Sequence, residues 1–193
     1  MQWVMRESSF KHRLIEQARI EKGHRILDLG CGTATLTILV KKSHPEAEVV
    51  GLDGDPRVLK IAKAKVARSD LDITLDLGLA FELPYPDNSF NRVLSSLLLH
   101  HLTRENKKRT LTEVLRVLRP GGELHLADFG KPYNLPTYLV SLVMRQLEEN
   151  RDNVRGLLPE FIKNAGFDSI EETIRHMTAL GGISFYRARK PHI

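Results

Sequence analysis

Hydrophobic positions along the chain follow two spacings in turn. Short apolar runs, typical of buried strands, are followed by stretches in which apolar residues recur every three or four positions, as on one face of a helix. The runs that predict strands are Arg25–Leu29, Glu48–Leu52, Leu71–Leu77, Phe90–Ser96 and Glu123–Asp128, and helices are predicted over 33–42, 55–67 and 104–118. Because strands and helices alternate at these intervals, we expect right-handed crossovers and a parallel sheet covered by helices on both faces.

The pattern changes after Gly130. The further elements predicted are helices over 133–149 and 157–165 and strands over Ser169–Met177 and Ile183–Arg189. A Gly-Gly turn separates the two strands, so we expect them to pair as an antiparallel hairpin. The predicted fold is α/β and Rossmann-like, a doubly wound, mostly parallel seven-stranded sheet with an antiparallel last strand.

Length and composition place these elements in one unit. A chain of 193 residues with 41% hydrophobic and 27% charged residues can bury one substantial core. We expect a single domain over residues 1–193, with an N-terminal helix within residues 1–22 and a substrate-side insertion at residues 131–156. The apolar face of the first helix is formed by Phe10, Leu14, Ile15 and Ala18.

The charge balance is basic. A formal net charge of +5 favours an anionic partner such as a phosphate, an anionic lipid surface or a nucleic acid, although a generally basic surface explains it more simply. The basic stretches Lys60–Arg68 and Arg104–Arg109 fall on predicted helices with apolar residues between the charges. This pattern is typical of solvated helix faces, so we do not expect a nucleic-acid partner.

Cysteine usage and the N-terminus bear on the compartment. Cys31 is the sole cysteine, so no intrachain disulfide can form, and no Cys/His spacing suits a structural zinc ion. The first residues lack a basic start and a signal-length apolar stretch, and no later run approaches the length of a membrane span. We expect a cytoplasmic protein with no metal site and no membrane span.

A glycine-rich segment, Asp28-Leu29-Gly30-Cys31-Gly32-Thr33, follows the first predicted strand. In open parallel sheets, ligands bind outside the carboxyl ends of the strands, and the loop after the first strand is a usual contact. The two glycines permit a sharp turn and a close approach to a ligand, and the start of the next helix presents unpaired N–H groups. The segment is therefore a candidate cofactor loop.

Two carboxylates help to choose the cofactor. Nicotinamide enzymes carry G-x-G-x-x-G, but here the third glycine position holds Thr35. Asp28 would be a poor neighbour for a pyrophosphate and a good one for an ammonium group, which S-adenosyl-L-methionine carries beside its sulfonium. Asp53, which ends the second strand, suits the ribose hydroxyls of either cofactor, and it could instead cap a helix. S-adenosyl-L-methionine is the predicted cofactor, and an NAD(P)-dependent Rossmann oxidoreductase stays the alternative.

Four segments, in this order, carry a resemblance to a known family. They are Asp28–Thr33, Gly51–Asp53, Glu82–Phe90 and Arg116–Gly122. The chain resembles class I S-adenosylmethionine-dependent methyltransferases, and within these the methyltransferase domain 11-like branch that includes the ubiquinone- and menaquinone-biosynthesis C-methyltransferases. The order and spacing of the segments decide the resemblance, and no single motif does.

The resemblance implies a set of cofactor-binding residues. The loop after the first strand would bind the methionine part, Asp53 the ribose and Gly78–Phe81 the adenine, while Ser96 would lie near the methyl group. The full set is Asp28, Gly30, Cys31, Gly32, Thr33, Asp53, Gly54, Leu79, Ala80, Phe81 and Ser96. The product of the reaction would be S-adenosyl-L-homocysteine.

Three positions depart from the family's pattern. The family commonly has a third glycine where Ala34 stands, and an Asp where Asn91 stands. It usually has an Asp or Asn, which contacts the adenine amino group, where this chain has Leu79. We therefore expect backbone atoms to read the base here and Phe81 to pack against it.

The implied chemistry needs few side chains. Methyl transfer from a sulfonium is an in-line displacement with an activated donor, so the enzyme chiefly supplies proximity and a dry, oriented site. If the acceptor must lose a proton, His100 and His101 are the candidate bases, although helix packing or support of the cofactor explains them equally well. Cys31 lies in the cofactor turn and is a poor candidate for a nucleophile.

The insertion at residues 131–156 bears on the acceptor. Its apolar, adaptable side chains Tyr133, Tyr138, Leu142 and Met144 favour a small acceptor of lipophilic character. The same helix could instead cover the sheet edge or pair with a second subunit in a homodimer. A non-catalytic S-adenosylmethionine-binding module is the third interpretation of the chain.

Overall fold

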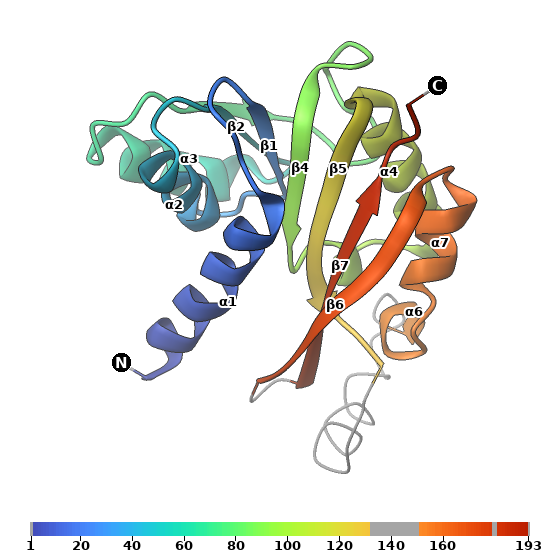
Figure 1. Ribbon diagram of the computed structural model, residues 1–193. Helices are drawn as coiled ribbons and strands as arrows, with labels where there is room; N and C mark the ends of the chain where they lie inside the picture. The colour runs from blue at the N-terminus through green and yellow to red at the C-terminus, as the bar shows by residue number, and fades with distance from the viewer. Residues whose placement is uncertain (1, 132–150, 179–180, 193) are drawn as a thin grey trace.

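The computed structural model describes residues 2–131, 151–178 and 181–192. At its centre lies a seven-stranded sheet in the order β3-β2-β1-β4-β5-β7-β6 (Figure 1). The strands are β1 Arg25–Leu29, β2 Glu48–Asp53, β3 Thr74–Leu77, β4 Phe90–Ser96, β5 Leu118–Phe129, β6 Asp168–Thr178 and β7 Gly181–Arg189. The helices are α1 Gln2–Ala18, α2 Thr35–Ser43, α3 Pro56–Ala67, the 3-10 helix η1 Leu99–His101, α4 Arg104–Val117, α6 Arg151–Val154 and α7 Leu158–Asn164.

Strand pairing confirms the predicted fold class. The strands from β3 to β5 in the sheet order pair in parallel, and β1, the first in the chain, lies between β2 and β4. β7 runs antiparallel between β5 and β6, which confirms both the antiparallel last strand and the terminal hairpin. The chain enters the sheet near its centre, so the strand order reverses between β1 and β4, where doubly wound sheets bind ligands.

Three predicted strand boundaries are wrong. β7 begins at Gly181 rather than at Ile183, because the two glycines predicted as the hairpin turn pair with Met177 and Thr178 of β6. β3 begins at Thr74 rather than at Leu71, because Leu71 and Ile73 pack on the apolar cluster between α2 and α3 instead of pairing with β2. β5 begins at Leu118, directly after α4, rather than beyond the Pro-Gly-Gly turn. Backbone hydrogen bonds between that turn and Lys190 keep this stretch extended.

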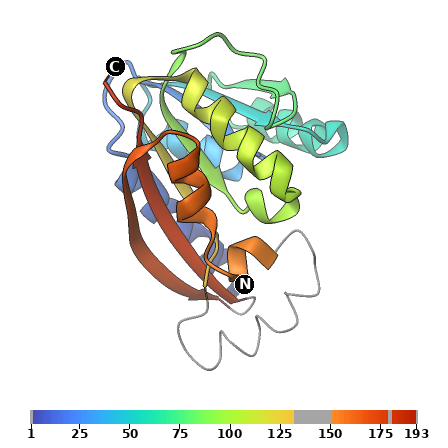
Figure 2. The ribbon, with the colours of Figure 1, turned by 90° about the vertical axis from the view of Figure 1, so that its right-hand side faces the viewer.

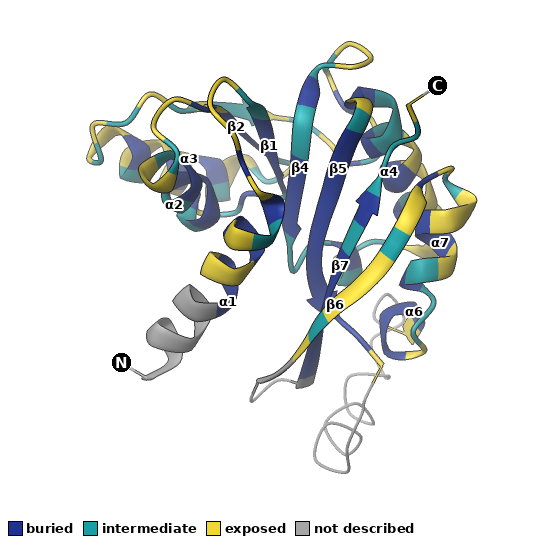
Figure 3. Ribbon diagram, viewed as in Figure 1, coloured by how far each residue is buried: buried dark blue, intermediate teal, exposed yellow. Residues whose placement is uncertain are grey.

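Helices cover the two faces of the sheet with separate apolar clusters (Figures 1 and 2). α1 and α2 pack on one face, where Phe10 of α1 joins the cluster that contains Leu94 of β4. α4 and α7 pack on the other face, where Leu111 and Phe161 join the cluster that contains Val93. The central strands β4 and β5 are therefore buried for most of their length (Figure 3), although polar residues stand among the apolar ones in both.

A buried polar network fixes α1 on the sheet. Gln17 of α1 donates to the carbonyl oxygen of Tyr186 at 3.1 Å, and its amide nitrogen lies 3.2 Å from Nδ1 of His125. Nε2 of His125 lies 3.2 Å from Glu123, and that carboxylate also accepts from Arg187 at 2.6 Å. Because buried polar groups cost free energy unless they are paired, these contacts hold α1 against β5 and β7.

The helix predicted over 133–149 lies outside the described residues, as does most of the 131–156 insertion. The described part contains α6, which the buried Asp152 ties to the start of α4 through ion pairs with Arg104 and Lys107. No helix of the described residues is long and apolar enough to cross a membrane.

Candidate functional site

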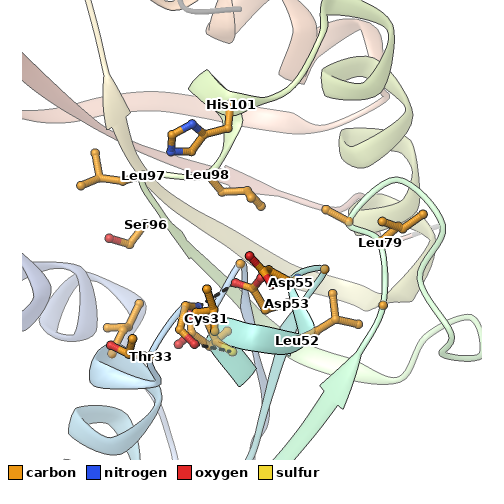
Figure 4. A pocket seen from close by; sticks show the side chains of 18 of the residues that line it. Cys31, Thr33, Leu52, Asp53, Asp55, Leu79, Ser96, Leu97, Leu98 and His101 are labelled. Atoms are coloured by element: carbon orange, nitrogen blue, oxygen red, sulfur yellow. Dashed lines mark hydrogen bonds between the residues drawn. The ribbon is translucent and has the colours of Figure 1, made fainter. Parts of the chain in front are cut away.

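A pocket opens at the carboxyl ends of β1, β2 and β4 (Figure 4). Its volume is about 650 Å³, within the range of pockets that hold small molecules and cofactors. All of the residues predicted to bind the cofactor line it, namely Asp28, Gly30, Cys31, Gly32, Thr33, Asp53, Gly54, Leu79, Ala80, Phe81 and Ser96. Loops that follow neighbouring strands thus meet at one edge of the sheet, as the topology requires.

The turn after β1 depends on two glycines in the left-handed region. Gly30 has φ +72°, and a Cβ at this position would lie 2.8 Å from Cδ1 of Leu98. Gly32 has φ +55°, and a Cβ there would meet no atom within 4 Å. Gly30 therefore permits close packing against the loop after β4, whereas Gly32 leaves open space beside the backbone, where a ligand can approach.

Asp53 braces this turn from the end of β2. One oxygen of its carboxylate accepts the N–H of Gly32 at 2.8 Å, and the other accepts the N–H of Asp55 at 3.0 Å. The N-cap of α3 is Asp55, whose side chain accepts the N–H of Arg57 at 2.8 Å. The alternative that Asp53 caps the helix is therefore wrong, and its half-buried carboxylate faces the pocket (Figure 4).

Asp28 is the most buried charge in the pocket wall. Its residue is 1% exposed, and its carboxylate accepts a hydrogen bond from the Thr37 hydroxyl at 2.6 Å. Burial raises the pKa of Asp28 to about 6, although the Thr37 hydrogen bond and the charge of Lys11 both oppose the rise in pKa. A cation bound beside Asp28 would favour the ionised carboxylate.

Cys31 lies at the bottom of the turn and is buried. Burial and the nearby carboxylates of Asp28 and Asp53 raise the pKa of its thiol, which keeps it protonated. Cys31 packs in the apolar cluster between α2 and α3 while it also lines the pocket. No group of three or more His, Cys, Asp or Glu side chains among the described residues is arranged to hold a metal ion.

The segment after β3 forms the wall next to Asp53. Leu79 stands 47% exposed at its rim, where the family usually has an acid or an amide. Ala80 is buried, and Phe81 lies under the guanidinium of Arg109, whose Cζ is 5.1 Å from the ring centroid. This part of the wall offers backbone groups and an aromatic ring rather than a carboxylate side chain.

The loop after β4 closes the opposite end of the pocket with apolar side chains. Leu97 and Leu98 line it together with the predicted Ser96 and with His101 (Figure 4). Leu102 lines it as well. Leu97 has φ +58°, an uncommon conformation for a branched side chain. Backbone strain of this kind gathers at functional sites.

The two histidines occupy different places. His101 lines the pocket, whereas His100 is not among the lining residues. Nδ1 of His100 lies 2.9 Å from the fully buried carboxylate of Asp128, which also accepts the N–H of Leu99 at 2.7 Å. The two imidazole rings are in contact, with centroids 3.9 Å apart. The side chain of His100 is therefore fixed by Asp128, and it packs against His101 without lining the pocket.

Some lining residues were missed by the sequence analysis. Lys11 of α1 lines the pocket and is 9% exposed. The sequence carries a signal for it, because position 11 continues the apolar stripe of Leu14, Ile15 and Ala18 at helical spacing and so faces inward. Leu97 and Leu98 carried no such signal, since the loop after β4 has no periodic pattern.

Comparison with known families agrees with the class of protein that this fold and pocket define. Residues 26–122, half of the chain, match the family described as Methyltransferase domain. The chain belongs to this family, and its resemblance to class I S-adenosylmethionine-dependent methyltransferases of the menaquinone-biosynthesis branch is confirmed.

Individual relatives support this membership to different extents. Demethylmenaquinone methyltransferase from Listeria monocytogenes serotype 4a (strain HCC23) is 40% identical over 120 residues, which are 61% of this chain and 49% of that protein. The chain thus spans about half the length of that relative. An uncharacterized methyltransferase from Synechocystis sp. (strain PCC 6803) is 31% identical to this chain. The alignment covers 95% of this chain and 84% of the length of that protein.

A solved structure shows that the fold is shared. Haemonchus contortus phosphoethanolamine N-methyltransferase 2, solved with phosphomonomethylethanolamine and S-adenosylhomocysteine, aligns with a TM-score of 0.79 at 18% identity. The alignment covers 95% of this chain and 52% of that one. At this identity the likeness concerns the fold alone.

We predict that Gly30→Ala lowers the free energy of unfolding by about 3 kcal/mol, because a Cβ adds a clash with Leu98 to the strain of a left-handed φ. Gly23→Ala is the matched control, since Gly23 has φ +75° and no neighbour within 4 Å of the added Cβ. It should cost about 1 kcal/mol. Urea denaturation measures both, and equal losses at the two positions would contradict the predicted contact.

Proposed function

We propose that this chain binds S-adenosyl-L-methionine and transfers its methyl group to a small, lipophilic acceptor. One observation carries the proposal. The strand-end carboxylates Asp28 and Asp53 flank the turn of Gly30 and Gly32 in the same pocket. Each of these features suits one part of the cofactor. The buried carboxylate of Asp28 suits the ammonium group, and the open glycine turn suits the methionine chain. The carboxylate of Asp53 suits the ribose diol.

The donor set fits each part of the cofactor. Asp28 supplies the anion for the ammonium group, and Asp53 retains acceptor capacity for the ribose hydroxyls, because each of its oxygens accepts one backbone N–H. The open space at Gly32 admits the methionine chain. Ala80 and Phe81 would enclose the adenine, and the Arg109 guanidinium keeps the Phe81 ring in place.

The bound cofactor supplies an activated methyl group on a sulfonium. The protein's part is to orient it and to exclude water. Ser96 and the apolar side chains of Leu97, Leu98 and Leu102 form the far end of the pocket, where the acceptor would meet the methyl group. We propose His101 as the base at this end, because it lines the pocket.

The methyl acceptor would bind at the apolar end of the pocket. The side chains of Leu97, Leu98 and Leu102 suit a flat, lipophilic ring better than a charged head group. The name of the Listeria relative points in the same direction, since it denotes a demethylmenaquinone methyltransferase. We therefore propose a quinone-like ring in its reduced, hydroquinone form as the first acceptor to test, because only the electron-rich ring can attack a sulfonium methyl group. The cytoplasmic location and the homodimer stay predictions.

Two other functions compete with this proposal. A nicotinamide oxidoreductase would need a pyrophosphate beside Asp28, where burial makes a second anion costly. A non-catalytic module would bind the cofactor without an acceptor. The contact of His101 with the apolar end of the pocket favours the enzyme over this module.

Calorimetry separates the cofactors. We expect S-adenosylhomocysteine and S-adenosylmethionine to bind and NAD to give no signal. Asp53→Ala should weaken S-adenosylhomocysteine about 100-fold, because it removes a charged acceptor and the brace on Gly32. Asp72→Ala, an exposed carboxylate outside the pocket, is the control and should bind as the wild type does. NAD binding with no signal from either sulfur ligand would refute the proposal.

The pH profile of binding tests Asp28. Its pKa of about 6 means that it is ionised at pH 7.5 and mostly neutral at pH 5, so affinity for the ammonium falls as the pH drops. We expect S-adenosylhomocysteine to bind about tenfold more weakly at pH 5 than at pH 7.5. Asp28→Asn should flatten the profile, because an amide does not titrate. An unchanged slope in Asp28→Asn would show that another group titrates.

Methyl transfer tests His101. With a short-chain demethylmenaquinol, chemically reduced and kept anaerobic, and labelled S-adenosylmethionine, His101 would take the hydroxyl proton of the quinol as the ring carbon displaces S-adenosylhomocysteine from the methyl group. We expect His101→Asn to lower kcat about 100-fold while S-adenosylhomocysteine affinity stays within threefold. His100→Asn should have a smaller effect on kcat, because His100 lies behind His101. Wild-type turnover in both variants would remove the histidines from the chemistry and leave proximity as the sole contribution.

A further inference from the structure

The charges in the pocket wall are unevenly distributed. Three carboxylates line it, those of Asp28, Asp53 and Asp55. Among the described residues that line it, Lys11 is the one lysine or arginine. A pocket with this balance attracts the ammonium and sulfonium of the proposed cofactor but repels the carboxylate of its methionine part. Some feature of the wall must therefore receive that carboxylate.

We infer that Lys11 binds the methionine carboxylate, so that Lys11 and Asp28 together recognise the zwitterionic amino-acid end of S-adenosylmethionine. This inference rests on the proposed function, because it assigns a further residue to the same cofactor. It adds a partner from α1, outside the strand-end loops from which the sequence predicted the whole site.

The position of Lys11 favours binding over a purely structural role. Lys11 extends the inward stripe of Leu14, Ile15 and Ala18 on α1 and is 9% exposed, and this stripe brings a lysine to the pocket wall. Its charge lies close enough to Asp28 to lower the pKa of that carboxyl. The ammonium group of Lys11 is thus near Asp28. In the bound cofactor, Asp28 would hold the ammonium of the methionine part and Lys11 would hold its carboxylate.

The start of α2 supports the same placement. Thr35 and Leu36, the first residues of α2, line the pocket. The N-cap residue is Ala34, which makes no side-chain hydrogen bond to the helix. The first amides of α2 therefore receive no cap from that side chain, and amides at a helix start favour an anion. The N-terminus of a helix carries only a partial positive charge, whereas the ammonium group of Lys11 carries a full one.

The test compares S-adenosylmethionine with a ligand that lacks the carboxylate alone and with one that lacks the whole amino-acid end. Calorimetry would use wild type and Lys11→Met with S-adenosylmethionine, decarboxylated S-adenosylmethionine and 5′-methylthioadenosine. Methionine keeps the apolar length of the lysine stem and removes its charge. We expect wild type to prefer S-adenosylmethionine over its decarboxylated form by about tenfold or more, as for one charge-assisted hydrogen bond. In Lys11→Met this preference should disappear, while the affinity for the other two ligands changes less than about threefold.

Two further variants complete the design. Lys11→Arg should keep most of the preference, because it retains the charge. Arg13→Met is the matched control on the same helix, since Arg13 is exposed and lines a different groove, between α1 and β6. It should leave every affinity at the wild-type value.

The outcomes separate this inference from the proposed function. If wild type binds neither S-adenosylmethionine nor 5′-methylthioadenosine, the cofactor assignment fails and the role of Lys11 fails with it. If wild type binds both but Lys11→Met keeps the preference for the carboxylated ligand, the role of Lys11 alone is overturned. An equal loss for all three ligands would also overturn it, because that pattern means that Lys11 supports the fold of the pocket.

Discussion

The hydrogen bond from the Gly32 amide to Asp53 is the contact on which the pocket depends. It joins the turn after β1 to the end of β2 at 2.8 Å. The turn is further tied to β2 where the amides of Gly30 and Cys31 donate to the carbonyl oxygen of Leu52 at 2.8 and 3.0 Å. The loop is thus a continuation of the sheet, and its shape is set by the parallel register of β1 and β2. A loop held in this way presents its amides and carboxylates in one arrangement before any ligand arrives, which lowers the entropy that binding must offset.

Placing carboxylates in this wall has a cost that a ligand can reverse. Asp28 is almost fully buried, and burial alone disfavours its ionised form. Thr37 and the charge of Lys11 offset part of that cost in the protein itself. A cation in the pocket would offset the rest, so the unfavourable burial becomes selectivity for a positively charged ligand. Local features that weaken the fold are expected where a protein binds.

Family membership and function rest on different observations. The match over residues 26–122 covers the glycine turn, both strand-end carboxylates and the segment after β3, which are the parts common to this class. The fold is shared with a phosphoethanolamine N-methyltransferase at only 18% identity, so the fold does not identify the acceptor of this chain. In the proposed function the acceptor would meet Leu97, Leu98 and His101, which the loop after β4 brings to the pocket.

The sequence by itself determined the fold class and the glycine turn with its two carboxylates. Apolar runs that alternate with helical stretches allow few topologies, and in a doubly wound sheet the ends of β1, β2 and β4 must meet. Local signals failed where a residue serves a distant neighbour. Leu71 and Ile73 read as strand but pack between helices, and Asp55 rather than Asp53 caps α3. Helical spacing already turns Lys11 inward, but the tertiary structure decided that it reaches this pocket. Tertiary structure alone decided that His100 turns to Asp128 while His101 faces the cavity. The physical reason is range: periodicity and turn chemistry act over a few residues, whereas these placements depend on how α1 and the loop after β4 pack across the sheet.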